Sequence, residues 1–292
     1  NNLYKLENSI PSQIIEGLKE IGHNVEVIDG THGGGQAIKI DRKTGDLTGG
    51  SDPEKTATQK GTDQNEKNCK KFYLIGNDYN WPRDTNAIAK NTIADIGGEV
   101  VGEEYMPFTV DNFDSSLAKI KDTGADMVLI TLVGGASVSF NRAFASFGLA
   151  DNVMRLGTLI DENTLMGIGA ENSKNVFSAA SYFANIQTDD GKAFAKSYSD
   201  KFGSDAALLN GLSTSCYDGL TALDAIAERA GGLSVKDMDA VAEGTAFASP
   251  RGDAVMKNRH LTLDIYLSEA IGTDFKIVKT FSQQEPGNFC KA

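Results

Sequence analysis

The residues best suited to binding chemistry in this 292-residue chain lie just after an apolar run of strand length. The run at 72–75 (FYLI) is followed by residues 77–83 (NDYNWPR). Two aromatic rings can cover a small planar amide, and the Asp78 carboxylate can accept hydrogen bonds from N–H groups on such a ligand. A second interpretation is that Tyr79 and Trp81 only pack against the helix that follows.

Two further strand ends carry candidate residues. Gly134 and Gly135 follow the apolar run at 127–132, and small residues there let backbone amides at a helix N-terminus approach a ligand oxygen. A tight turn without a ligand fits this pair equally well. Asp161 and Glu162 follow another strand, and they act either as ligand acceptors or as the cap and first turn of a helix. For Glu162 we favour the capping role.

The polar residues form no catalytic or metal-binding pattern. The three histidines, which are far apart in the sequence, are His23, His32 and His260. The three cysteines, which lack the close spacing of a zinc or redox centre, are Cys69, Cys216 and Cys290. Either one disulfide forms, by any of three pairings, or all three thiols are unpaired. The sequence leaves both alternatives open. Signatures of the GxSxG, HExxH and P-loop kind do not occur, so we predict a protein that is not an enzyme and needs no cofactor or metal.

Composition narrows the class of protein further. The chain is 40% hydrophobic and 23% charged, with 31 Gly and 6 Pro, which is typical of an α/β protein with a substantial core. No apolar stretch approaches the roughly 18 residues of a membrane span. The formal charge of -12 disfavours nucleic-acid binding. The chain starts without the pattern of a secretory signal, so we expect such a signal to have been removed or never encoded here.

The first seventy residues predict a small α+β segment and a connector. Periodic apolar residues predict a helix at 9–21, and strands follow at 24–28 and 37–40 with a turn before Leu47. From 49 to 71 there is no periodicity and polar residues dominate, which is typical of a flexible connector.

Beyond the connector, strands alternate with helices. The predicted strands lie at 72–75, 99–105, 127–132, 155–159 and 176–182, and the predicted helices between them lie at 84–96, 113–121 and 137–147. This alternation indicates parallel βαβ units. Two long helices near 191–202 and 212–230 precede antiparallel strands at 261–267 and 275–280.

Four short runs near the start resemble a known family. GHNVEV at 22–27, GQAI at 35–38, DRKTG at 41–45 and GGSDP at 49–53 resemble the extreme C-terminal segment of the γ-glutamyltransferase small subunit. That family uses an N-terminal threonine nucleophile, which lies upstream of the matching tail. The threonines present here are internal and have no free amine as a base, so nothing catalytic carries over. We interpret residues 1–55 as a structural remnant or fused tail.

A stronger resemblance covers residues 71–292. FYLIGNDY at 72–79 with WPR at 81–83, GGEVVGEEY at 97–105 and FASPRG at 247–252 are similar to the urea and short-chain amide branch of type I periplasmic solute-binding proteins. The resemblance implies two doubly wound lobes that close on a ligand and deliver it to an ABC permease. It also implies that Tyr79, Trp81 and Tyr182 line the cleft.

These expectations combine into one description. We expect an α/β fold with a doubly wound parallel lobe at 71–205 and a partial second lobe with crossovers at 206–292, because family members carry most of the other lobe before the strand at 72–75. Residues 1–55 form the small α+β segment and 56–70 the linker. The predicted ligand-binding residues are Asp78, Tyr79, Trp81, Gly134, Gly135, Asp161 and Tyr182.

The predicted function is a periplasmic binding protein for urea, a short-chain amide or an amino acid in an ABC import system. A truncated or fused derivative of such a protein is included in this prediction. The alternatives are a γ-glutamyltransferase-related fragment without catalytic residues, and a fusion that folds but binds nothing.

Overall fold

The computed structural model describes residues 3–7, 12–20, 24–28, 36–41, 46–51, 69–203 and 206–285. Nearly the whole predicted linker at 56–70 lies outside these residues, as do Cys290, His23 and His32. Within the described part, no helix is long and apolar enough to cross a membrane.

The N-terminal elements form two small sheets. β1 (Leu3–Glu7) pairs in parallel with β2 (Asn24–Ile28), and α1 (Ser12–Glu20) joins them. β3 (Gln36–Asp41) and β4 (Asp46–Ser51) form an antiparallel hairpin. The predicted helix and the strands after it are confirmed. β1 was not predicted, because its five residues are too short to show a clear period.

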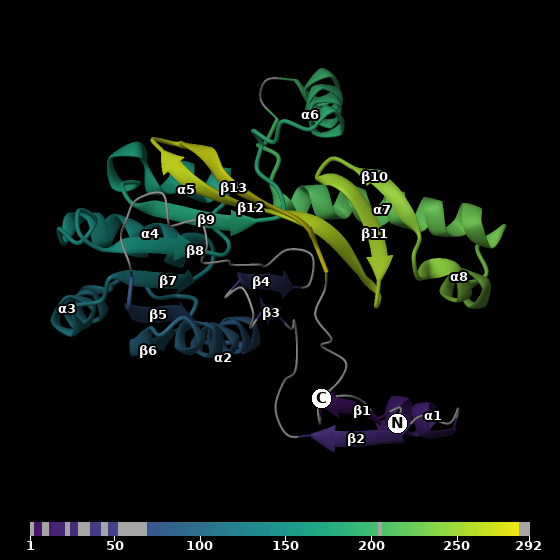
Figure 1. Cartoon of the computed structure of the whole chain (residues 1–292), viewed down its shortest axis with the longest axis horizontal. Helices are drawn as coiled ribbons and strands as arrows, with labels where there is room; N and C mark the ends of the chain where they lie inside the picture. Colours follow the sequence, from purple (N-terminus) through teal and green to yellow (C-terminus); the bar gives the residue numbers. More distant parts are fainter. Residues whose placement is uncertain are drawn as a thin grey trace.

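A mainly parallel sheet forms the centre of the molecule (Figure 1). Its parallel strands lie in the order β6-β5-β7-β8-β9, with bounds β5 (Lys71–Asn77), β6 (Glu99–Met106), β7 (Met127–Thr131), β8 (Met154–Gly157) and β9 (Val176–Ala180). β12 (His260–Ile271) pairs antiparallel with β9, and β13 (Asp274–Gln284) pairs antiparallel with β12. The predicted parallel arrangement is therefore confirmed.

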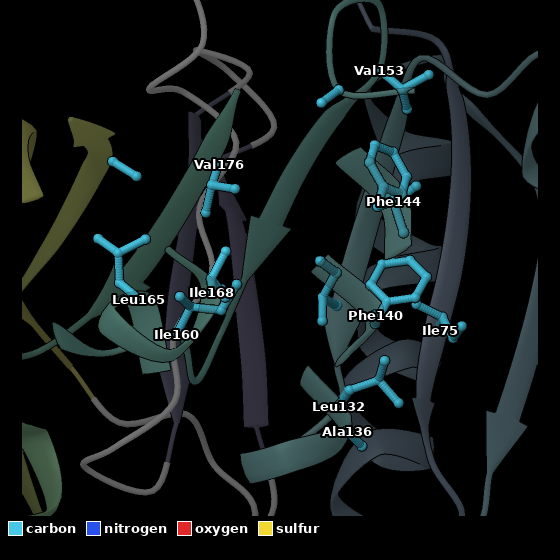
Figure 2. Close-up of a cluster of buried hydrophobic side chains, with 14 of the residues drawn as sticks. Ile75, Leu132, Ala136, Phe140, Phe144, Val153, Ile160, Leu165, Ile168 and Val176 are labelled. Carbon is cyan, nitrogen blue, oxygen red and sulfur yellow. The ribbon is translucent and has the colours of Figure 1, made fainter. Parts of the chain in front are cut away.

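Helices cover both faces of this sheet. One face packs on α3 (Asp114–Thr123), α4 (Gly134–Ser146) and α5 (Glu162–Ile168), and its cluster includes Tyr73 and Ile75 of β5 together with the rings of Phe140 and Phe144 (Figure 2). The opposite face packs on α2 (Asn80–Asp95), where β5 contributes Phe72 and Leu74. Because both faces are buried here, β5 and β7 read as continuous apolar runs in the sequence.

A second group of elements follows β9. It contains α6 (Asp189–Phe202), α7 (Gly211–Ala230), α8 (Val235–Ala242) and the antiparallel pair β10 (Ala246–Ser249) and β11 (Gly252–Lys257). A short 3-10 helix, η2 (Ala170–Asn172), follows α5. β12 joins the two groups, since residues 260–262 pair with β11 and residues 266–269 pair with β9.

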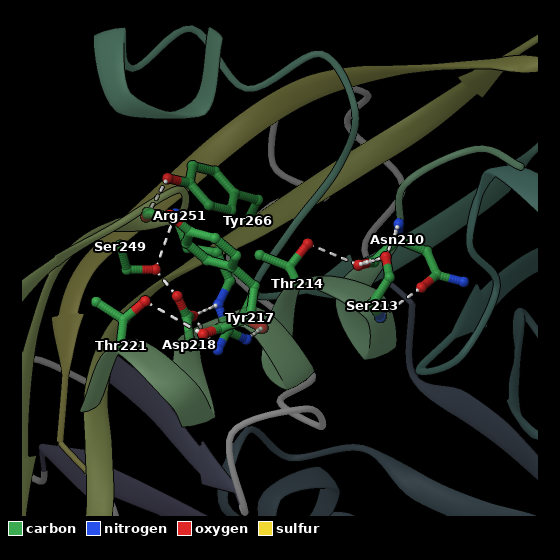
Figure 3. A network of polar contacts seen from close by, with 10 residues as sticks. Asn210, Ser213, Thr214, Tyr217, Asp218, Thr221, Ser249, Arg251 and Tyr266 are labelled. Atoms are coloured by element: carbon green, nitrogen blue, oxygen red, sulfur yellow. Dashed lines mark hydrogen bonds and ion pairs between the residues drawn. The ribbon is translucent and has the colours of Figure 1, made fainter. Parts of the chain in front are cut away.

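A buried ion pair fastens this junction (Figure 3). The Arg251 guanidinium, fully buried, donates through Nε to Asp218 Oδ2 of α7 at 2.7 Å and through Nη1 to Ser181 Oγ, beyond β9, at 2.7 Å. Ser249 Oγ donates to the same Asp218 oxygen at 2.8 Å, and Tyr266 of β12 donates to the Arg251 carbonyl at 3.2 Å. Arg251 belongs to the FASPRG motif and ties α7, the β10–β11 turn, β12 and the segment after β9 together.

Candidate functional site

The predicted site residues lie at one end of the sheet, where the carboxyl ends of its parallel strands meet. We call this end the carboxyl edge. Tyr79, Gly134, Asp161 and Tyr182 each follow the carboxyl end of a strand, namely β5, β7, β8 and β9. These strands are consecutive neighbours and run in parallel, so the four loops lie side by side along the same edge. Ligands of open α/β sheets bind at this edge.

Asn77, at the end of β5, organises three of the edge loops. Its buried side chain accepts a hydrogen bond from the Val133 backbone N–H at 2.8 Å. Its Nδ2 donates to the carbonyls of Met106 and Pro107, each at 3.4 Å. The loops after β5, β6 and β7 are therefore fixed to one another. The sequence motif contained Asn77, but nothing in its pattern singled it out.

Asp78 lies exposed at the start of this edge and holds Arg83. Arg83 donates to Asp78 Oδ1 through Nε at 2.9 Å and through Nη2 at 2.6 Å. The guanidinium also lies 4.2 Å from the ring centroid of Tyr105. An exposed pair of this kind contributes little to stability, so its main effect is to orient the Asp78 carboxylate.

Three aromatic rings form one group beside Asp78. The Tyr79 ring is half-buried, with ring centroids 6.1 Å from Trp81 and 5.1 Å from Phe108, and burial raises the pKa of its hydroxyl. Trp81 is only 3% exposed, whereas Phe108 is 57% exposed. The rings that solvent or a ligand can reach are thus Tyr79 and Phe108, with Trp81 packed behind them. Phe108 was missed, although it follows β6 as Tyr79 follows β5.

Gly134 and Gly135 begin α4 at the next loop. Both are exposed, Gly134 has a φ of +53°, and a Cβ on either residue would meet no atom within 4 Å. The cap residue of α4, Val133, provides no side-chain hydrogen bond to the helix start. The first amides of α4 therefore face the edge without a capping side chain.

Asp161 takes the capping role that the sequence offered as an alternative, whereas Glu162 does not. Asp161 is the cap of α5, since its Oδ1 accepts the Thr164 backbone N–H at 2.8 Å. Its Oδ2 accepts a hydrogen bond from Asn210 Nδ2 at 2.7 Å, and Asn210 in turn caps α7. The expectation that Glu162 acts as a cap is wrong: its side chain turns inward and is only 6% exposed, and its Oε1 accepts the Ala184 backbone N–H at 2.6 Å.

Glu162 is the most perturbed carboxyl group at the edge. Burial raises its pKa to about 7, although the hydrogen bond from Ala184 acts in the opposite direction. Its Oε2 is buried without a hydrogen-bond partner among the residues that the structure describes. Tyr182 is 3% exposed, and burial followed by the charge of Glu162 raises its pKa to about 12. The edge thus offers a buried acceptor next to a buried phenol.

The edge offers hydrogen-bond acceptors, backbone donors and aromatic surface, but no metal centre. In the described ranges no group of three or more His, Cys, Asp or Glu side chains could hold a metal ion.

A cleft of about 550 Å³ lies elsewhere, between α6, the start of α7 and Pro250, and its lining includes none of the seven predicted residues. The arrangement is suited to binding a small solute.

The chain belongs to the periplasmic binding protein family, whose sequence profile matches residues 51–274. This is a family of non-enzymatic solute-binding proteins, in agreement with the expectation that the chain is not an enzyme.

Individual relatives agree with this assignment. Leu/Ile/Val-binding protein homolog 6 of Brucella melitensis is 30% identical over 236 residues, which cover 76% of this chain and 60% of the relative. A solute-binding protein of an ABC transporter from Rhodopseudomonas palustris HaA2, solved with p-hydroxybenzoic acid, is 26% identical, with a TM-score of 0.71 and coverage of 80% of this chain and 65% of that one. A branched-chain amino acid ABC transporter ligand-binding protein from Burkholderia xenovorans LB400 shares the fold, with 21% identity, a TM-score of 0.65 and coverage of 76% and 62%. The chain spans less than two thirds of the length of each.

Proposed function

We propose that this chain is, or derives from, the solute-binding component of an ABC importer, and that it acts in the periplasm with a membrane permease as its partner. The observation that carries the proposal is the convergence of Tyr79, Gly134, Asp161 and Tyr182 at one carboxyl edge of a parallel sheet. Ligands bind there in open α/β folds. Membership of the family supports the same interpretation.

The ligand is a small solute whose head group both donates N–H bonds and accepts a hydrogen bond. The acceptor at the edge is Glu162 Oε2, which has no hydrogen-bond partner among the described residues, and the uncovered amides at Gly134 can take a carboxylate or carbonyl oxygen. An amino acid and a short amide both have this combination. The Leu/Ile/Val-binding relative favours a branched-chain amino acid and the Rhodopseudomonas relative favours an aromatic acid, whereas the FYLIGNDY and FASPRG motifs carry the proposal of urea or an amide. Tyr79 and Phe108 provide the surface for the apolar part.

The second lobe of this chain is proposed to be incomplete. More than a third of the p-hydroxybenzoic acid-binding relative has no counterpart here. A site with one complete wall leaves ligand polar groups in contact with water, so affinity is expected to be weak. The resemblance of residues 1–55 to a γ-glutamyltransferase tail remains a proposal about the origin of that segment, most of which precedes the family match at residue 51.

Calorimetric titration with leucine, valine, acetamide, urea and 4-hydroxybenzoate tests both the proposed solute-binding role and the proposed class of ligand. We expect binding of an amino acid or an amide, and a loss of at least about tenfold in affinity in Tyr79→Ala, because an aromatic contact contributes on the order of 1 kcal/mol beyond its buried area. Phe147→Ala removes a ring of 39% exposure at the other end of α4 and is the matched control. Trp81→Ala is unsuitable, since removing a buried indole destabilises the fold by about 3–5 kcal/mol.

Two results would contradict the proposal. If none of the five solutes binds at millimolar concentration, the chain is not a working receptor for these classes. If a solute binds equally well to the wild type and Tyr79→Ala, the site lies away from the carboxyl edge. A ligand present at 100 times its dissociation constant should also add about 2.7 kcal/mol to the unfolding free energy, which a thermal-shift measurement checks independently.

A further inference from the structure

The carboxyl group of Glu162 is buried between α5, the segment that follows β9 and the start of β13. Its side chain is 6% exposed, and its Oε1 accepts the Ala184 backbone N–H at 2.6 Å. The segment that carries Ala184 is held in place, because the rings of Phe183 and Phe275 lie 4.8 Å apart and Asn185 Nδ2 donates to the Phe275 carbonyl. The second oxygen, Oε2, accepts no hydrogen bond from any described residue. Half of this carboxyl group is therefore left without a partner inside its own lobe.

The charges that act on Glu162 are negative. Asp161 precedes it in the chain and Asp274 begins β13, and both disfavour ionisation of the buried carboxyl group. Tyr182, the titratable side chain of the segment after β9, is a buried phenol whose pKa the charge of Glu162 raises further. Glu171 of η2, which follows α5, is exposed and also acidic. A carboxylate at this position thus meets acidic neighbours on three elements.

Cations on the neighbouring elements are directed elsewhere. Arg142 of α4 donates to the carbonyl of Ile168, the last residue of α5, at 3.4 Å. Lys276 of β13 is exposed, and Lys279 of the same strand lies over the ring of Phe281. Within α4, α5, η2, β13 and the segment after β9, no other lysine or arginine occurs. These elements therefore supply no counter-charge to the buried carboxyl group.

Such a setting favours the neutral form of a carboxyl group. Burial penalises the ionised form, and neighbouring negative charge adds to the penalty. In agreement with this, the pKa of Glu162 is raised to about 7, with burial as the largest cause. A positive charge within about 4–6 Å has the opposite effect, because it stabilises the carboxylate. The arrival of a cation beside Oε2 should therefore expel the proton.

The solute itself can supply this cation. An amino acid carries an ammonium group, and its carboxylate can take the uncapped amides at Gly134. We propose that Glu162 holds a proton while the site is empty and releases it to the solvent when the ammonium group of an amino acid binds beside it. This coupling depends on the solute-binding role proposed above, and it names an amino acid as the class of solute.

Calorimetric titration of leucine into the whole chain, in phosphate and in Tris, counts the protons released on binding, because the two buffers take up a proton with different heats. For a carboxyl group that titrates near pH 7, we expect roughly 0.9 proton released per leucine at pH 6 and roughly 0.1 at pH 8. The affinity for leucine should rise about tenfold over the same range, since at pH 8 binding no longer has to remove the proton.

Two variants and a second solute assign the proton to Glu162. Glu162→Gln cannot ionise, so leucine should release no proton from it and should bind equally well at pH 6 and pH 8. Glu171→Gln removes an exposed acidic group beyond the other end of α5 and should behave as the wild type. Acetamide has no positive charge, so it should bind the wild type without releasing a proton.

The possible results separate this coupling from the solute-binding role. Loss of leucine binding in Glu162→Gln, with acetamide binding retained, would also support the coupling. Equal heats of leucine binding in the two buffers at pH 6, or proton release that persists in Glu162→Gln, would overturn it and leave the solute-binding role intact. Binding of acetamide or 4-hydroxybenzoate without binding of leucine would overturn it as well. If none of these solutes binds, the proposed function itself fails, and the coupling fails with it.

Discussion

Replacement of Glu162 by glutamine should change how stability depends on pH. In the folded protein the pKa of this buried carboxyl is about 7, whereas its ordinary value is 4.5. Between these two pH values the folded state keeps the proton and the unfolded state releases it. The unfolding free energy therefore falls as pH rises through this window, and the cost is complete above pH 7.

The size of the effect follows from the same two values. One pH unit corresponds to about 1.4 kcal/mol, so ionisation of Glu162 costs roughly 3 kcal/mol of stability at pH 8. Glutamine resembles the protonated carboxyl and keeps an oxygen that can accept the Ala184 backbone N–H. At pH 4.5 we expect nearly equal stability of the two proteins, and at pH 8 we expect Glu162→Gln to be more stable by up to about 3 kcal/mol.

Urea unfolding at half-unit steps from pH 4.5 to 8.5 measures this difference. All other titrating groups are common to both proteins, so they cancel when the wild-type free energy is subtracted from that of the variant. A difference that does not change with pH would refute the reasoning. A variant that is less stable at pH 8 would show instead that the ionised carboxylate has a partner that stabilises it.

Two further predictions concern the junction and the sheet. Arg251→Met leaves Asp218 buried without its ion pair, so we expect the unfolding free energy measured with urea to fall by about 3–5 kcal/mol. The double variant with Asp218→Leu should recover much of this loss. Equal losses in the single and double variants would argue against a charge effect. Gly102→Ala would place a Cβ against the ring of Tyr73 and should lower stability by about 1–3 kcal/mol in thermal unfolding. Gly135→Ala, whose Cβ would meet no atom within 4 Å, should be nearly neutral. Similar effects of the two substitutions would contradict this account.

The sequence predicted the central sheet well because its strands are buried on both faces. β5 and β7 each read as an uninterrupted apolar run, and the glycine at 124 ends α3 where its left-handed φ of +64° is required. Elements without such marks were missed: β10 has three small residues around one phenylalanine, and α8 is eight residues long with no buried residue.

The candidate site could be predicted only as far as single loops allow. Strand ends identified Tyr79, Gly134 and Asp161, because a parallel sheet gathers the residues that follow its strands. The contacts between loops could not be predicted. Asp161 binds Asn210 across 49 positions of sequence, and whether Glu162 turns toward solvent or toward Ala184 depends on packing that no local pattern records.

The path of β12 has a consequence for synthesis of the protein. β9 (VFSAA) carries no charge, and its outer edge pairs with residues 266–269, which are synthesised long after it. Until then, the nascent chain presents an apolar edge strand, and apolar edges pair readily with other chains. The risk of aggregation at this edge therefore lasts until β12 has been made, and a ribosome stall before residue 260 should yield an insoluble product even though the five parallel strands are already complete.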